Sequence, residues 1–241
     1  MSDNLQPRGS DDTSFAQPLY TPIKRRSFFM YAGATAGATA LVLAGCSNNS
    51  DVTHTPSGTI SLGAGDVGVL NYAYALEQLE AAFYAKVVAS PAADFQAGEL
   101  AYFTEVAAHE AIHRDFLKAA INRDAPGKLL QNLTPNFTSI DFTKRLSVFT
   151  AAQAFEDLGV AAYNGAGILI KTAAYLVIAG QIVSVEGRHA AYVRERLAPN
   201  TFSSSPQIDA NGLDMQMSPT AVIAAAQAFI MEKLDASTVG K

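Results

Sequence analysis

Four long segments of the chain place apolar side chains three or four positions apart, the spacing that gives a helix one apolar face. They cover about residues 67–88, 96–122, 143–168 and 173–197. Short breaks separate the first segment from the second and the third from the fourth, whereas an irregular connection with proline and asparagine covers residues 123–142. Two short connections around one long one are typical of a four-helix bundle, built from two hairpins joined by a crossover. The predicted class is all-α.

Capping signals mark both ends of the helical region. Asp66 precedes the first apolar repeat and is expected to cap that helix through its carboxylate. Ser218 is followed by Pro219, and a capping serine before a proline is typical of a helix start. An additional C-terminal helix is therefore expected from Ser218 to about residue 234, within an extension that begins at about residue 200.

Residues 1–46 have the pattern of an export signal. Arg25 and Arg26 belong to a twin-arginine motif, and the apolar run that follows at residues 31–43 is too short to span a membrane. The sequence that ends at Cys46 resembles a bacterial lipobox, which implies cleavage before Cys46 and acylation of its thiol. An uncleaved N-terminal membrane helix is the alternative.

Cysteine usage agrees with a lipid anchor. Cys46 is the single cysteine of the chain, so it can form neither an internal disulfide nor a thiolate metal site. Residues 47–64 lack an apolar period and are expected to be a flexible tether, which leaves residues 65–241 for one domain. The expected location is the bacterial cell envelope, lipid-anchored on the periplasmic or outer-membrane face.

Charge argues against nucleic acid as a partner. The formal net charge is −5, and no basic cluster follows residue 26. Nucleic-acid phosphates require a concentrated face of lysine and arginine, which this sequence does not offer.

Two copies of the pattern Glu-x-x-His lie midway along the second and fourth predicted helices. They are Glu110 with His113, and Glu186 with His189. Residues three apart share one helix face, so each pair can present an oxygen and a nitrogen to the same ion. The repeat predicts that the two histidines are equivalent.

The first and third predicted helices carry matching partners. Glu77 and Tyr84 are seven residues apart, as are Glu156 and Tyr163, and seven residues are nearly two helical turns. Each glutamate is about as far from its hairpin turn as the glutamate on the neighbouring helix. The four acids and the two histidines can therefore meet in one layer of the bundle.

This arrangement resembles the ferritin-like di-iron and di-manganese carboxylate proteins, in which two helices each supply a glutamate and two each supply Glu-x-x-His. The resemblance covers residues 65–197, and the leader and C-terminal helix are similar to exported ferritin-like-domain proteins that include desiccation-related proteins. It implies a ferritin-like bundle with six metal ligands: Glu77, Glu110, His113, Glu156, Glu186 and His189. It also implies that Tyr84 and Tyr163 hydrogen-bond to ligand carboxylates.

Glu80 is a further candidate ligand, because it shares a helix face with Glu77. The repeat favours Glu77, since the counterpart of Glu80 is Gly159. Glu99 and Glu195 are expected on solvated helix faces, because buried unpaired glutamates are rare. Two further acids are candidates for supporting the ligands, namely Glu105 and Asp157.

Charge balance favours metal ions at such a cluster. Four converging carboxylates cannot stay ionised in a protein core without compensation, and two divalent cations would neutralise them. Carboxylate and imidazole suit iron or manganese and also accept zinc. The expected function is oxygen or peroxide redox chemistry, as a di-iron oxidase, a peroxidase or a di-manganese catalase, or iron handling under stress. A non-catalytic desiccation-protective binding domain is the alternative, and a homodimer remains open.

One competing motif overlaps the cluster. Residues 109–113 match the zinc-protease pattern H-E-x-x-H, in which His109 and His113 would bind zinc and Glu110 would be the base. No third ligand follows at a usual spacing, and the second Glu-x-x-His would be left unexplained. In the di-metal interpretation, His109 is either a surface residue or a neighbour of a ligand.

Overall fold

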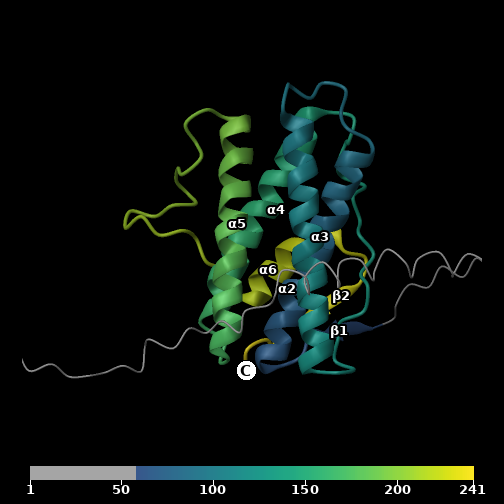
Figure 1. Cartoon of the computed structure of the whole chain (residues 1–241), viewed down its shortest axis with the longest axis vertical. Coiled ribbons are helices and arrows are strands. Elements are labelled where there is room, and N and C mark those ends of the chain that lie inside the picture. Colours follow the sequence, from purple (N-terminus) through teal and green to yellow (C-terminus); the bar gives the residue numbers. More distant parts are fainter. Residues whose placement is uncertain (1–57) are drawn as a thin grey trace, which may run out of the picture. The chain divides into compact units, whose positions relative to one another are not determined.

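The computed structural model describes residues 58–241. The predicted twin-arginine motif, the lipobox at Cys46 and most of the predicted tether lie outside the described residues. Within the described part, four long helices form two hairpins, followed by one short helix and accompanied by a two-stranded sheet (Figure 1). The predicted all-α bundle with an additional C-terminal helix is confirmed.

The first hairpin consists of α2 (Gly65–Ala89) and α3 (Glu99–Asp124), and the second of α4 (Arg145–Gly167) and α5 (Ala173–Leu197). The predicted helices agree with these bounds to within three residues at each end. The long connection between α3 and α4 runs along the side of the bundle from one end to the other (Figure 1). The two hairpins meet mainly through α2 and α4.

α2 is buried on almost every side, because α3, α4, the crossover and the C-terminal segment surround it. Two polar side chains of α2 hold the crossover in place. The amides of Asn71 and Gln78 exchange hydrogen bonds with backbone groups between Lys128 and Leu133. Buried amides need such partners, so these bonds fix the crossover against the helix that carries Glu77.

Asp66 does not cap α2, contrary to the sequence-based expectation. Ala64 stands at the N-cap without a side-chain bond, and the Asp66 carboxylate instead accepts hydrogen bonds of 2.8 Å from the backbone N–H groups of Lys171 and Thr172. Thr172 is the N-cap residue of α5, so Asp66 satisfies backbone N–H groups immediately before another helix. The two hairpins are thereby joined at one end of the bundle.

The C-terminal helix begins as predicted but ends early. The Ser218 hydroxyl accepts from the N–H of Ala221 at 3.3 Å, and α6 (Pro219–Ala226) continues only into the short η2 (Gln227–Phe229). The Gln227 side chain bonds to backbone groups of residues 230, 232 and 234, and this replaces the helical hydrogen bonds. The expectation of a helix to residue 234 was therefore wrong.

Strand β2 (Lys233–Asp235) pairs in parallel with β1 (Thr59–Ser61). The end of the predicted tether therefore belongs to the fold, and Leu62 is fully buried. Three-residue strands carry too few positions for an alternating pattern, which explains why periodicity missed them.

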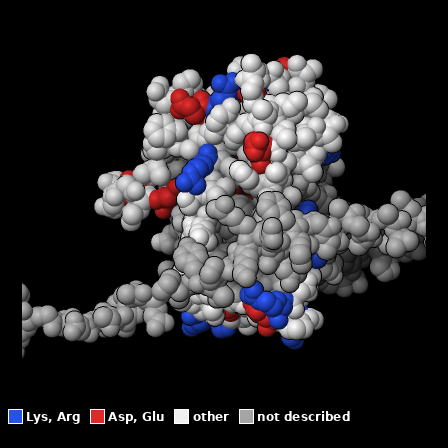
Figure 2. Space-filling model, viewed as in Figure 1, with Lys and Arg blue, Asp and Glu red and all other residues white. Residues whose placement is uncertain are grey.

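Where the described surface is visible in Figure 2, acidic and basic side chains lie interspersed among neutral ones. Over residues 58–241, no helix combines the length and the apolar character needed to cross a membrane.

Candidate metal centre

Each of the four long helices brings one glutamate to the interior of the bundle. Glu77 of α2, Glu110 of α3, Glu156 of α4 and Glu186 of α5 are all buried to at least 99%. Carboxylates are almost never buried to this extent unless they are paired or bind metal.

The acids and the two histidines form two groups that share a pair of carboxylates. One group consists of Glu77, Glu110, His113 and Glu186, and the other of Glu110, Glu156, Glu186 and His189. Within each group, one ligand atom per residue lies within 4.8 Å of all the others. The predicted six residues thus meet in one layer, with Glu110 and Glu186 placed between the two groups.

Both histidines direct Nδ1 toward the acids. Nδ1 of His113 lies 2.9 Å from Glu186 Oε1 and 3.4 Å from Glu110 Oε2. Nδ1 of His189 lies 3.0 Å from Glu110 Oε1 and 3.5 Å from Glu156 Oε2. Despite these distances, both Nδ1 atoms and most of the facing carboxylate oxygens have no hydrogen-bond partner among the described residues.

Buried polar atoms without partners are rare in native proteins. Here eight of them face one another, on six side chains from four helices: Glu77, Glu110, His113, Glu156, Glu186 and His189. They surround one shared space in the interior of the bundle. The donor set is carboxylate and imidazole, which is the set that iron and manganese accept. The residues present therefore fit two divalent ions.

The two tyrosines cross over between the halves of the bundle. The hydroxyl of Tyr163 in α4 donates to Glu77 Oε1 of α2 at 2.5 Å. The hydroxyl of Tyr84 in α2 donates to Glu156 Oε1 of α4. Each of these carboxylates keeps its second oxygen, Oε2, for the shared space. The tyrosines make the predicted kind of contact, each with the glutamate of the other helix.

Protons compensate the buried charge when no metal is present. Burial raises the pKa of Glu77 well above its ordinary range and that of Glu156 to about 8. Burial also opposes a charge on His113 and His189, but the adjacent carboxylates outweigh it and raise the pKa of each to about 12. Burial alone would raise the pKa of Glu110, but the two histidines hold it at about 2. Metal binding would have to displace such protons.

Glu80 is a fifth buried acid, 4% exposed, at the edge of this layer. It belongs to neither group of candidate ligands. A Cβ atom at Gly159 would lie 3.1 Å from Glu80 Oε1, so the glycine provides the space that this carboxylate occupies. Burial, reinforced by the neighbouring carboxylates, raises the pKa of Glu80 well above its ordinary range. Glu77, rather than Glu80, lies among the converging ligand atoms.

His109 is also outside both groups. Its Nδ1 atom lies 3.0 Å from Nε2 of His189, on the side of that ring away from the carboxylates. Of the alternatives for His109, the structure thus selects the neighbour of a candidate ligand. Within the described part, His109 and His113 do not converge with a third ligand, as the zinc-protease pattern would require.

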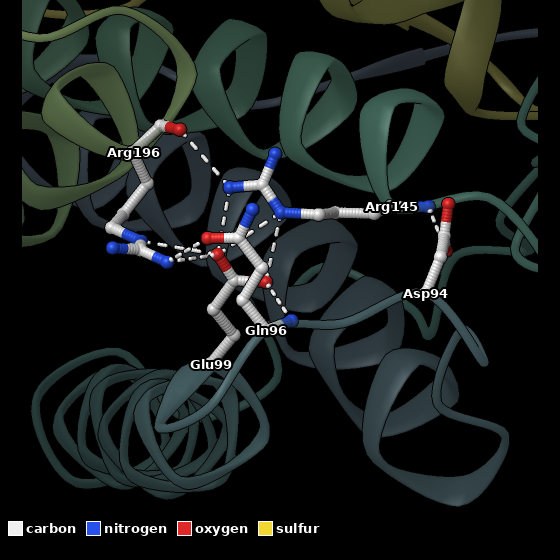
Figure 3. A network of polar contacts seen from close by, with 5 residues as sticks. All are labelled: Asp94, Gln96, Glu99, Arg145 and Arg196. Carbon is white, nitrogen blue, oxygen red and sulfur yellow. Dashed lines mark hydrogen bonds and ion pairs between the residues drawn. The ribbon is translucent and has the colours of Figure 1, made fainter.

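The expectation for Glu99 was wrong, because this residue is fully buried. Its carboxylate pairs with Arg145 of α4 at 2.7 Å and Arg196 of α5 at 2.7 Å, and it accepts from the backbone of Gln96 (Figure 3). Burial raises the pKa of Glu99, but Arg145, Gln96 and Arg196 outweigh it and lower it to about 2. The partners lie 46 and 97 positions away, so no local pattern could reveal them.

The two acids predicted to support the ligands, Glu105 and Asp157, form no hydrogen bond with a candidate ligand among the described residues. Glu105 is exposed. Asp157 forms an ion pair with Arg194, with Oδ1 2.7 Å from Nε. Glu195 is half-buried rather than solvated, and it accepts from the N–H of Thr201.

Tyr102 is a residue of the site that sequence reasoning missed. Its hydroxyl donates to the backbone carbonyl of His189 at 3.0 Å. Tyr102 lies seven positions before His109, nearly two helical turns, so both residues face α5. The same seven-residue spacing occurs in each Glu–Tyr pair, so the sequence could have indicated that Tyr102 belongs to the site.

Comparison with known proteins agrees with this geometry. The family model of the ferritin-like domain matches residues 65–199, which is more than half of the chain and includes every candidate ligand. The chain therefore belongs to the ferritin-like domain family. No curated protein matches it.

Proposed function

We propose that the chain holds two iron or manganese ions between its two hairpins, as a di-metal carboxylate centre. The observation that carries this proposal is the convergence of eight buried, unpartnered nitrogen and oxygen atoms in two groups that share Glu110 and Glu186. Membership of the ferritin-like domain family supports the same assignment.

Each set of residues has a separate task at this centre. Glu110 and Glu186 belong to both groups and would serve both ions, while Glu77 with His113 and Glu156 with His189 would each complete one group. Tyr84 and Tyr163 orient the outer carboxylates through their hydroxyls. Bound iron or manganese would supply Lewis acidity and redox activity for a reaction with dioxygen or peroxide.

Metal content tests the proposal. Protein purified without chelator and loaded anaerobically with Fe(II) should contain about two ions per chain, and Glu156→Ala should lose much of this metal. Fewer than about 0.3 ions per chain in the wild type would contradict a di-metal centre. Zinc as the sole metal would preserve the site but exclude the redox role.

Turnover of peroxide or consumption of dioxygen separates catalysis from a purely protective binding role. Loaded protein should consume one of the two oxidants, and His113→Ala should abolish this activity because it removes a ligand. A stoichiometric metal content without turnover would favour the non-catalytic alternative, in which the domain binds iron under stress or desiccation.

We also propose that the domain is exported through Arg25 and Arg26 and anchored to the cell envelope by acylation of Cys46. The sequence pattern alone supports this proposal, because these residues lie outside the described part. Cys46→Ala removes the acylated residue and should therefore move the protein from the membrane fraction to the soluble fraction, because stable membrane binding depends on the acyl chains. Wild-type protein with a free Cys46 thiol in the soluble fraction would refute the anchor.

A further inference from the structure

His189 has two polar contacts from α3 that hold both its ring and its backbone. Nε2 of His189 lies 3.0 Å from Nδ1 of His109, and the two rings are nearly parallel at 8°. The hydroxyl of Tyr102 donates to the His189 carbonyl at 3.0 Å, and Tyr102 stacks on Tyr192 with ring centroids 3.9 Å apart. His189 is therefore constrained from the side opposite the carboxylates.

Among residues 58–241, no side chain gives His113 equivalent support. At the offset that relates Glu110 to Glu186, the counterparts of His109 and Tyr102 in α5 are Val185 and Ile178. Neither of these side chains can form a hydrogen bond. The side chain of His113 is 12% exposed, compared with 6% for His189. The two halves of the centre thus have matching ligands but different surroundings.

We propose that His109 is a positioning residue for His189, and that the centre therefore binds its two ions unequally. The tighter position is the group that contains His189, and the weaker one is the group that contains His113. This inference rests on the proposed di-metal centre.

The physical reason is preorganisation of the ligand ring. A metal ion at Nδ1 of His189 requires the ring proton on Nε2, from which it is donated to Nδ1 of His109; His109 then carries its own proton on Nε2. The ring is thus held in both the orientation and the tautomer that bind metal. The ring of His113 is not held in this way, so it must take up the metal-binding orientation and tautomer when the ion binds. Partners of this kind typically change metal affinity by about 10–100-fold.

Titration of the full chain with Mn(II) tests the inference. The wild type should bind two ions, the first at least about tenfold more tightly than the second. His109→Phe keeps an aromatic ring but removes the hydrogen bond, and should weaken binding of the tighter ion by about 10–100-fold. His109→Gln, whose side-chain oxygen can accept the same bond, should retain most of the affinity. Val185→Ala, the matched position in α5, should change neither step.

A second comparison assigns the two positions without altering His109. After desalting, His113→Ala should retain about one Mn(II) with the electron paramagnetic resonance spectrum of an isolated ion, whereas His189→Ala should retain almost none. Equal losses in these two variants would overturn the inference, even if His109→Phe did not fold. So would an unchanged isotherm in His109→Phe. In both cases the wild type would still bind two ions, whereas a wild type without Mn(II) or Fe(II) would overturn the di-metal centre as well.

Discussion

Tyr72 and Tyr163 are both buried, but only one of their hydroxyls has a partner. The Tyr163 hydroxyl binds Glu77, whereas the Tyr72 hydroxyl has no hydrogen-bond partner among the described residues. A hydrogen bond therefore offsets the free-energy cost of burying the Tyr163 hydroxyl, but not the cost of burying the Tyr72 hydroxyl. The two positions therefore form a matched pair for measuring what the hydrogen bond to the candidate ligand contributes.

Tyr163→Phe should lower the free energy of unfolding of the metal-free protein by about 1–2 kcal/mol, because it leaves a buried Glu77 oxygen without its donor. It should also weaken metal binding by about tenfold. Tyr72→Phe should be neutral or stabilising by up to about 1 kcal/mol and should leave metal binding unchanged. Urea unfolding and metal titration measure both quantities. Equal effects of the two substitutions would show that the Tyr163 hydroxyl does not support the site.

The network around Glu99 joins three helices at one end of the bundle (Figure 3). Glu99 begins α3, Arg145 begins α4, and Arg196 is in the last turn of α5. Arg145 also donates to the backbone carbonyl of Arg196 at 3.0 Å. The network closes the end opposite Asp66, so each end of the bundle has an acid that ties one hairpin to the other.

The pH dependence of stability should report this network. The pKa of Glu99 is lowered to about 2, so its contribution is complete above the pKa of the unfolded chain and is lost as pH falls toward the folded value. Glu99→Gln should therefore cost about 2–3 kcal/mol at pH 7, about half of that near pH 3, and almost nothing near pH 2. Urea unfolding at these three pH values measures the difference. Glu105→Gln, at an exposed site of α3, should differ from wild type by less than about 0.5 kcal/mol throughout.

The segment after α5 packs its backbone directly on α4. A Cβ atom at Gly165 would lie 1.9 Å from the carbonyl oxygen of Met217, and the N–H of Met217 donates to the carbonyl of Ala161 at 2.9 Å. Only glycine permits this approach. A Cβ atom added at Gly180 of α5, in contrast, would meet no other atom within 4 Å.

Gly165→Ala should destabilise the domain by about 3 kcal/mol, because the clash involves backbone that cannot rotate away. Gly180→Ala should stabilise it by about 0.5–1 kcal/mol, because alanine loses less conformational entropy in a helix. Thermal unfolding of both variants decides the point. A mild Gly165→Ala would mean that residues 200–217 can leave α4 without cost.

The sequence pattern predicted those parts of the molecule that depend on local spacing. Helix bounds follow from apolar periodicity and from proline and glycine breaks, and the six converging residues follow from the i, i+3 and i, i+7 intervals on helices of known pairing. For the polar side chains, the pattern failed where a side chain could pair either locally or with a distant segment. Asp66 binds the N–H groups before α5 instead of its own helix, and Glu99 binds two distant arginines instead of water. These choices depend on which segments become neighbours after folding.

The placement of the candidate ligands has a consequence for the whole bundle. Each group takes residues from both hairpins: Glu186 joins three residues of the first hairpin, and Glu110 joins three of the second. Of the four long helices, α5 has the least cover: six of its 25 residues are buried, and two of these are the candidate ligands Glu186 and His189. The N-terminal half of α5 has one buried side chain, Ile182, so bound metal would add substantially to the attachment of this helix.

Metal should therefore stabilise the two hairpins as one unit. Mn(II) at about 1,000 times its dissociation constant should add about 4 kcal/mol per site, which corresponds to a rise in thermal midpoint of about 8–16 °C for each site. Amide hydrogen exchange should slow most in α5, because its opening requires release of both ions. Glu186→Gln, which weakens both groups at once, should abolish both effects, whereas Glu105→Gln should preserve them. Protection spread evenly over the four helices, or confined to α2 and α3, would contradict a centre that joins the hairpins.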